Sequence, residues 1–196
     1  REGRWSPDGR SILFVSDRTG RYAAHVLDLE TRDIRAVTTG AAQESEPAWA
    51  PDGKRIVYVA DRTRLMAAAP GAAPELLAEV PASADYFNVS EIRAPSWTPT
   101  GVVHFEVRGG TTRLKRGSSI LAEGEGLAPL RAVPVARDGL LHSADGEIRI
   151  LRGTGSERIP FTADVTVATP GYRRAERDFT SRRARPVVGI AAPALS

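Results

Sequence analysis

Cysteine is absent from this sequence, and the 196 residues contain a single methionine, Met66. The lack of thiols excludes disulfide frameworks, thiolate metal sites and cysteine nucleophiles, but it says nothing about the cellular compartment. Long apolar runs are also missing, since none approaches the roughly 20 residues that a membrane-spanning helix needs. We therefore expect no membrane span.

The composition is that of a folded domain, and its positive charge is local. Hydrophobic residues make up 41% of the chain and charged residues 26%, with 27 basic and 24 acidic side chains. Residues 171–196 hold six arginines and two acidic residues, a net charge of +4, so the overall charge of +3 leaves −1 for residues 1–170. Nucleic-acid binding through the arginine cluster at 173–185 is a minority alternative, because Glu176 and Asp178 interrupt the cluster. A solvated connector is the favoured interpretation.

A repeat is the strongest pattern in the chain. Residues 5–19 align without a gap on residues 49–63, an offset of 44 residues. A third copy begins at Trp97 and a degenerate fourth at Val135, while residues 193–196 match residues 47–50. Because the chain starts and stops within a repeat, we expect it to be a segment of a larger protein.

Each copy predicts four short antiparallel strands. In the first copy the turn Pro7-Asp8-Gly9 ends one strand, and runs rich in β-branched and aromatic residues follow at 11–16, 22–29 and 34–37. The corresponding runs lie at 55–60, 65–68 and 75–78 in the second copy, at 102–107, 112–116 and 119–122 in the third, and at 140–143, 147–151 and 157–161 in the fourth. No helical periodicity competes with this pattern.

A four-stranded unit of about 40 to 45 residues is the size of a propeller blade, which must stack on its neighbours to bury its faces. A β-sandwich would show alternating strands without a repeat at an offset of 44 residues. A solenoid is the other alternative architecture. We predict an all-β fold, a partial β-propeller of about four four-stranded antiparallel blades that is incomplete at both ends. The blades are expected near 1–40, 47–80, 94–123 and 130–161, followed at 162–196 by an arginine-rich connector and the start of a further blade.

The candidate site residues are those that recur at the repeat turns, and we interpret them as structural. They are Trp5, Pro7, Asp8, Gly9, Asp17, Trp49, Pro51, Asp52, Gly53, Asp61, Trp97, Pro99, Gly101, Asp138 and Gly139. In such turns proline presets its backbone angle, aspartate caps backbone N–H groups, and glycine accepts a positive φ. Backbone capping is therefore favoured over calcium binding for the aspartates. The tryptophans are expected to lie between adjacent blades.

Catalytic constellations are not evident in the sequence. Metal-dependent hydrolysis needs clustered histidines and carboxylates, but His25, His104 and His142 each stand alone. We interpret His104 and His142 as partly exposed strand residues. The chain has no Gly-x-Ser-x-Gly elbow, and Gly153-Thr154-Gly155 indicates a turn instead of a phosphate loop. We predict no catalytic residue, no metal ligand and no cofactor site in this segment.

Several of these motifs together resemble a known family. Four motifs of the first copy resemble the WD-repeat-like blade of TolB-like propellers. They are Trp-Ser-Pro-Asp-Gly at 5–9, Ser-Asp-Arg-Thr-Gly at 16–20, Leu-Asp-Leu at 27–29 and Arg-Ala-Val-Thr at 35–38. The resemblance covers most of residues 1–161 and is strongest in the first two copies. Residues 172–190 are similar to an inter-blade connection in the propeller of some bacterial amidohydrolases.

This resemblance implies a non-catalytic function. TolB-like blades form non-catalytic propellers of periplasmic or secreted bacterial proteins, so the segment is expected to be a protein-interaction or substrate-access scaffold in a larger exported hydrolase, amidohydrolase-like or a peptidase. Its partner would be another protein or the adjoining catalytic domain of the same chain, and the connection at Ala82–Ala94 would be a main contact. The alternative is a stand-alone periplasmic TolB-like adaptor.

Overall fold

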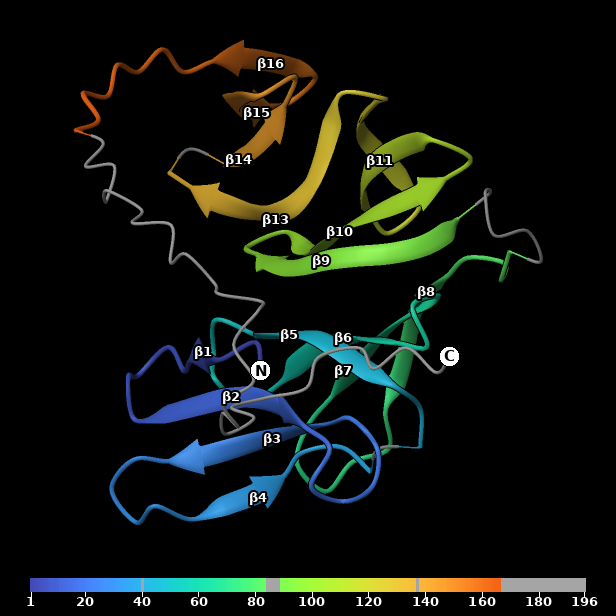
Figure 1. Ribbon diagram of the computed structural model, residues 1–196, viewed down its shortest axis with the longest axis vertical. Helices are drawn as coiled ribbons and strands as arrows, with labels where there is room; N and C mark the ends of the chain where they lie inside the picture. Colours follow the sequence, from blue (N-terminus) through green and yellow to red (C-terminus); the bar gives the residue numbers. More distant parts are fainter. Residues whose placement is uncertain (40, 84–88, 137, 167–196) are drawn as a thin grey trace, which may run out of the picture. The chain divides into compact units, whose positions relative to one another are not determined.

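The computed structural model describes residues 1–39, 41–83, 89–136 and 138–166. Within them the chain forms sixteen β-strands and no helix (Figure 1). Residues Arg1–Phe161 make one compact unit, and Thr162–Ser196 make a second, of which the described part is without regular secondary structure. The described residues contain no helix long and apolar enough to cross a membrane.

The strands form four antiparallel sheets of four, each built from strands that are consecutive in the chain. Blade 1 consists of β1 (Arg4–Trp5), β2 (Ser11–Ser16), β3 (Ala23–Asp28) and β4 (Ile34–Ala36), and blade 2 of β5 (Glu44–Trp49), β6 (Ile56–Ala60), β7 (Arg64–Ala68) and β8 (Glu75–Glu79). Blade 3 consists of β9 (Ser90–Thr98), β10 (Gly101–Arg108), β11 (Thr111–Arg116) and β12 (Ser119–Gly124), and blade 4 of β13 (Leu127–Val135), β14 (Gly139–Ala144), β15 (Glu147–Arg152) and β16 (Gly155–Arg158). These four sheets confirm the predicted all-β, partial propeller.

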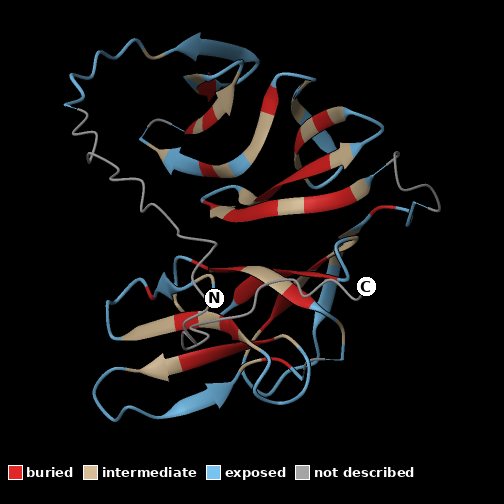
Figure 2. Cartoon of the chain, viewed as in Figure 1, coloured by how far each residue is buried: buried red, intermediate tan, exposed pale blue. Residues whose placement is uncertain are grey.

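Three apolar clusters hold successive blades together. Leu13 and Val26 of blade 1 pack with Ile56 of blade 2, and Val57 of blade 2 packs in a cluster with Ile92 of blade 3. A third cluster joins blade 3, through Phe105 among others, to blade 4. Figure 2 shows the buried residues concentrated along strands such as β6 and β9. Most of the core thus lies between sheets, because a single four-stranded sheet cannot bury its own faces.

The repeated tryptophans differ in their surroundings. Trp49 packs against the cluster between blades 1 and 2, and Trp97 packs against the cluster between blades 2 and 3. Trp5 occupies the equivalent position in blade 1 and is 65% exposed. The same residue therefore closes a blade interface in blades 2 and 3 only.

Strand boundaries differ from the predicted ones at two kinds of place. The first strands of blades 2, 3 and 4 begin at Glu44, Ser90 and Leu127, ahead of the expected starts at 47, 94 and 130. Register shifts in each of these strands' ladders allow pairing to continue beyond a bulge. The last strand, expected at 157–161, is instead β16, because Arg152 pairs with Gly155 across a two-residue turn.

The loop predicted at Ala82–Ala94 is shorter than expected. Residues 90–94 begin β9, since Ser90 pairs with Arg108 and Arg93 pairs with Phe105 in β10. The expectation of a loop is therefore wrong for this half, and residues 84–88 lie outside the described part of the chain.

Candidate functional site

The repeat turns are held by their own side chains. Asp8 Oδ1 accepts the Arg10 backbone N–H at 3.0 Å, and Asp52 Oδ1 accepts the Lys54 N–H at 2.9 Å. Hydrogen bonds from the Ser6 hydroxyl and the Arg10 N–H lower the pKa of Asp8. Gly9 and Gly53 follow these aspartates with φ of 71° and 67°, where a side chain would be strained. The prolines of the first three copies, Pro7, Pro51 and Pro99, lie exposed in these turns.

Other recurring residues have individual roles. Asp61, with φ of 49°, accepts the Gln43 N–H at 2.9 Å, and this bond lowers its pKa. The Asp17 carbonyl accepts the Gly20 N–H at 2.8 Å. Gly101 and Asp138 have φ of 124° and 55°. Gly139 is closely packed, because an added Cβ would lie 2.8 Å from Val135 and 3.0 Å from Ile150, and these side chains would have to shift.

All three histidines are buried, so the interpretation of His104 and His142 as partly exposed residues is wrong. His25, His104 and His142 are 2%, 1% and 5% exposed and lie in three different blades. The blade faces that hold them are covered, which the spacing from a turn glycine cannot reveal. Burial lowers the pKa of both His104 and His142, which keeps the two rings uncharged at neutral pH. Among the described residues no three or more histidines, aspartates or glutamates come together as a possible metal site.

An ionic chain, consisting of Arg62, Glu91, Arg93 and Glu46, links blades 2 and 3. Arg62 donates to Glu91 at 2.6 Å, Arg93 donates to Glu91 at 3.0 Å, and Arg93 Nε donates to Glu46 at 2.7 Å. Burial by itself would raise the pKa of Glu91, but the hydrogen bonds from the two arginines lower it on balance. The carboxylates of this chain are thereby engaged in joining strands β5 and β9.

A second bond pattern follows the repeat. Glu2, Glu46 and Ala94 occupy equivalent positions and share positive φ values of 60°, 53° and 48°. The Glu2 carboxylate accepts the Glu46 N–H, and the Glu46 carboxylate accepts the Ala94 N–H. Ala94 cannot continue the series, and in blade 4 Arg131 donates to the Pro95 carbonyl instead. Burial lowers the pKa of Arg131 to about 10.

These glutamates were not among the residues predicted from the sequence. A signal was available, because a glutamate precedes the tryptophan by three positions in both of the first two copies. The role of these glutamates depends on the distance between neighbouring blades, and a single sequence does not contain that distance.

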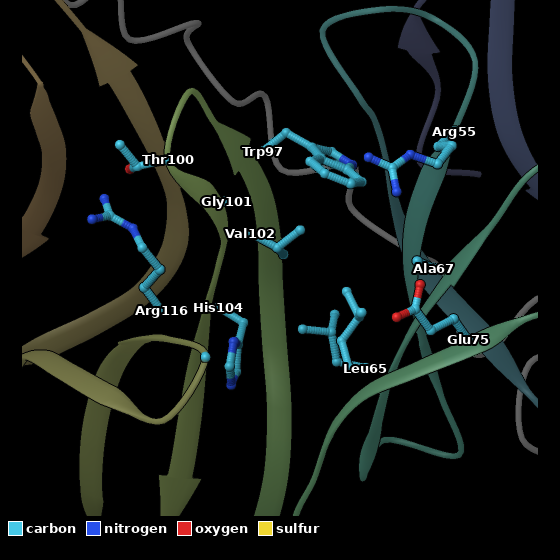
Figure 3. Close-up of a pocket in the computed structure, with 12 residues that line it drawn as sticks. Arg55, Leu65, Ala67, Glu75, Trp97, Thr100, Gly101, Val102, His104 and Arg116 are labelled. Atoms are coloured by element: carbon cyan, nitrogen blue, oxygen red, sulfur yellow. The ribbon is translucent and has the colours of Figure 1, made fainter.

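A pocket of about 420 Å³ lies between blades 2 and 3 (Figure 3). Blade 2 contributes Arg55 and residues of β7 and β8, and blade 3 contributes residues of β9, β10 and β11 and the turns beside them. The pocket is lined by Arg55, Leu65, Ala67, Glu75, Leu77, Trp97, Thr100, Gly101, Val102, His104, Arg116 and Gly117. Of the predicted turn residues, only Trp97 and Gly101 belong to it.

The two walls of the pocket carry different side chains. On the blade 2 side Leu65 and Leu77 offer apolar surface. On the blade 3 side His104 Nε2 lies 3.4 Å from Glu106, which accepts from Lys115 Nζ at 2.8 Å. Burial would raise the pKa of Glu106, but the Lys115 ammonium lowers it overall. Glu106 and Lys115 are thus engaged with each other behind His104 and are not part of the lining.

Several polar groups of the pocket lack partners. The Arg55 guanidinium lies 4.9 Å above the Trp97 ring and, like Glu75 and Arg116, forms no ion pair with any other residue that the structure describes. Trp97 Nε1, His104 Nδ1 and Arg116 Nε are buried without a hydrogen-bond partner in the same part of the chain. The pocket therefore combines an apolar floor with charges that remain available.

Four stacked antiparallel sheets of this kind define a β-propeller architecture, and the pocket is a groove between two of its blades. No model of a known protein family matches the chain, and no curated protein matches it. Solved structures do match, and they confirm the TolB-like propeller fold that the repeat motifs predicted.

Three of these structures come from different proteins. TolB from Acinetobacter baumannii is 21% identical with a TM-score of 0.57, and the match covers 81% of this chain and 42% of that one. An oligogalacturonate lyase from Vibrio parahaemolyticus is 16% identical with a TM-score of 0.55, covering 79% and 50%. A prolyl endopeptidase is 15% identical with a TM-score of 0.56, covering 81% and 28%. The chain thus spans half or less of the length of each.

Proposed function

We propose that this chain is a non-catalytic propeller segment that binds a protein partner or controls access to an adjoining domain. The observation that carries the proposal is the pocket between blades 2 and 3, where Arg55, Glu75 and Arg116 stand without ion-pair partners among the described residues, around an apolar floor. An apolar patch with a few available polar groups is the usual form of a binding site. By contrast, the carboxylates of the ionic chain are already engaged between strands.

A second surface supports the same proposal. Pro81, Ala82, Ser83 and Val89, together with Arg108, line a groove of about 350 Å³ beside the β10–β11 turn. This is the described part of the connection that the sequence singled out as a contact region. Such connections tolerate variation and often carry recognition, because the strands that hold them stay rigid.

We further propose that the segment belongs to a larger exported bacterial hydrolase, amidohydrolase-like or a peptidase. Its likeness to an oligogalacturonate lyase and a prolyl endopeptidase, of which it spans only part, supports an attachment to an enzyme. The likeness to TolB supports the alternative, a stand-alone periplasmic adaptor. A His-x-His or Gly-x-Ser-x-Gly region downstream in the gene would favour the enzyme, and a stop soon after the last blade would favour the adaptor. The arginine cluster at 173–185 lies outside the described residues.

Site-specific photo-crosslinking tests the binding function. A benzophenone side chain at Thr100, which lines the pocket, is expected to capture one defined protein or the adjoining domain in the native host. The matched control is the same group at Glu157 on β16, whose side chain is 79% exposed. No product at Thr100, or the same products at both positions, would contradict the proposal, as would hydrolytic turnover by the purified chain.

A further inference from the structure

We infer that the pocket between blades 2 and 3 binds a peptide segment in which an apolar side chain is followed by an acidic one. This inference rests on the proposed protein-binding function and specifies the partner's chemistry. It is carried by the shape of the pocket, the composition of its floor and the charges around it.

The floor accounts for the apolar side chain. Leu65 and Ala67 of blade 2 face Val102 of blade 3, and the Trp97 ring closes one end (Figure 3). Leu77 of blade 2 adds to the apolar lining. A volume of about 420 Å³ is large enough for a leucine- or phenylalanine-sized group with part of its backbone. Burial of such a group removes apolar surface from water on both partners, which is the main favourable contribution to binding.

The charges account for the acidic side chain. Arg55 and Arg116 stand on opposite walls, and Glu75 is the single acidic residue of the lining, so the pocket carries one excess positive charge. Arg55 is held in place over the Trp97 ring, and the buried Nε–H of Arg116 lacks an acceptor among the described residues. A carboxylate can accept from either arginine, while Glu75 can accept a backbone N–H of the peptide.

A smaller pocket, lined by blade 2 and the connection that leads into it from blade 1, lacks this combination. It has a volume of about 220 Å³, and its arginine, Arg64, is paired with Asp61 at 2.6 Å. Its glutamate, Glu44, is 3% exposed and accepts the Ala24 N–H at 2.9 Å. The charges of that pocket are thus bound within the protein, which singles out the blade 2–3 pocket.

Three capped dipeptides test the inference on the whole chain by NMR titration or calorimetry. Acetyl-Phe-Asp-amide is expected to bind, and acetyl-Ala-Asp-amide to bind about tenfold more weakly because it lacks the buried ring. Acetyl-Phe-Lys-amide is expected to bind about fivefold more weakly because its charge is reversed. Absence of binding by acetyl-Phe-Asp-amide, or equal binding of the Asp and Lys peptides, would overturn the inference.

Variants locate the binding. Ala67→Leu narrows the pocket floor and is expected to abolish binding of acetyl-Phe-Asp-amide. Arg55→Gln changes an exposed side chain, so it should weaken the binding of the same peptide about fivefold without affecting the fold. The matched control is Arg113→Gln, a β11 arginine outside the lining that pairs with Glu123. Equal affinity in all three variants would show that the peptide binds elsewhere. If the peptides fail while the Thr100 crosslink succeeds, the inference falls and the binding function stands.

Discussion

At the scale of single residues, positions that are equivalent in the sequence repeat contribute differently to the stability of the fold. Trp5, Trp49 and Trp97 begin the same motif, yet only the latter two pack against the preceding blade. What a tryptophan contributes depends on the area that its surroundings remove from water.

The two first tryptophans therefore form a matched pair for mutation. Trp49→Ala is expected to lower the free energy of unfolding by about 2–4 kcal/mol, since it leaves a cavity between blades 1 and 2. Trp5→Ala removes the same side chain from a site that is 65% exposed, and should cost less than about 1 kcal/mol. Urea unfolding of both variants measures the difference. Equal losses would mean that Trp49 does not hold the interface.

His104 introduces a pH dependence. Its pKa in the folded protein is lowered by burial from the ordinary value of 6.5, which applies to the unfolded chain. Below about pH 6.5 this histidine therefore binds a proton in the unfolded chain but not in the folded chain. The free energy of unfolding falls as the pH drops toward the pKa of the folded state. His104→Gln should make the loss of stability between about pH 7 and pH 5 shallower. His142, shifted in the same direction, remains as an internal reference. An unchanged slope would contradict this account.

At the scale of elements, the first strand of each blade is the joining element. In strand β5 the Glu46 N–H donates to the Glu2 carboxylate ahead of β1, and the Glu46 carboxylate accepts the Ala94 N–H of blade 3. The positive φ at Glu46 turns its backbone N–H out of the β5–β6 ladder, where the register shifts. The bulge thus leaves a backbone N–H outside the ladder, where it forms a hydrogen bond between blades.

Glu46→Ala tests this role. The variant loses the acceptor for the Ala94 N–H and the partner of Arg93, and is expected to destabilise the protein by about 2 kcal/mol. Glu46→Gln keeps a carbonyl acceptor and should cost less. Glu123→Ala is the control, because its 2.8 Å pair with Arg113 lies on the surface and contributes about 1 kcal/mol or less. Thermal or urea unfolding would contradict the role if the two alanine variants were alike.

At the scale of the whole molecule, stability is shared between neighbours. Strand β9 contributes Ile92 to the cluster with blade 2 and Ala94 to the cluster with blade 4. Blade 3 is therefore packed on both sides, and its unfolding exposes two interfaces at once. This arrangement favours a concerted transition of residues 1–161 over independent melting of single blades.

Phe105→Ala examines this coupling. Phe105 is fully buried between blades 3 and 4, and its truncation should cost about 3–5 kcal/mol. Hydrogen exchange of amides in β2 and β3, far from the mutation in sequence, is expected to accelerate together with that in β10 and β14. Acceleration confined to blades 3 and 4 would show that the blades open separately.

Local pattern was sufficient for the strands, the turns and the blade architecture. The run at 11–16 is the strand β2 without change, because turn residues and β-propensity act over a few positions that the sequence displays together. The resemblance of the motif at 5–9 to TolB-like blades pointed to the same fold.

Tertiary contacts decided the burial of the histidines, the ionic chain and the pocket. Arg62 and Glu91 are 29 residues apart and Glu46 and Arg93 are 47 apart, so no local rule pairs them. The pocket forms where the face of blade 2 that carries Leu65 and Leu77 meets the face of blade 3 that carries Val102 and His104. Each face follows from its own segment, but the space between them arises only when the two sheets pack.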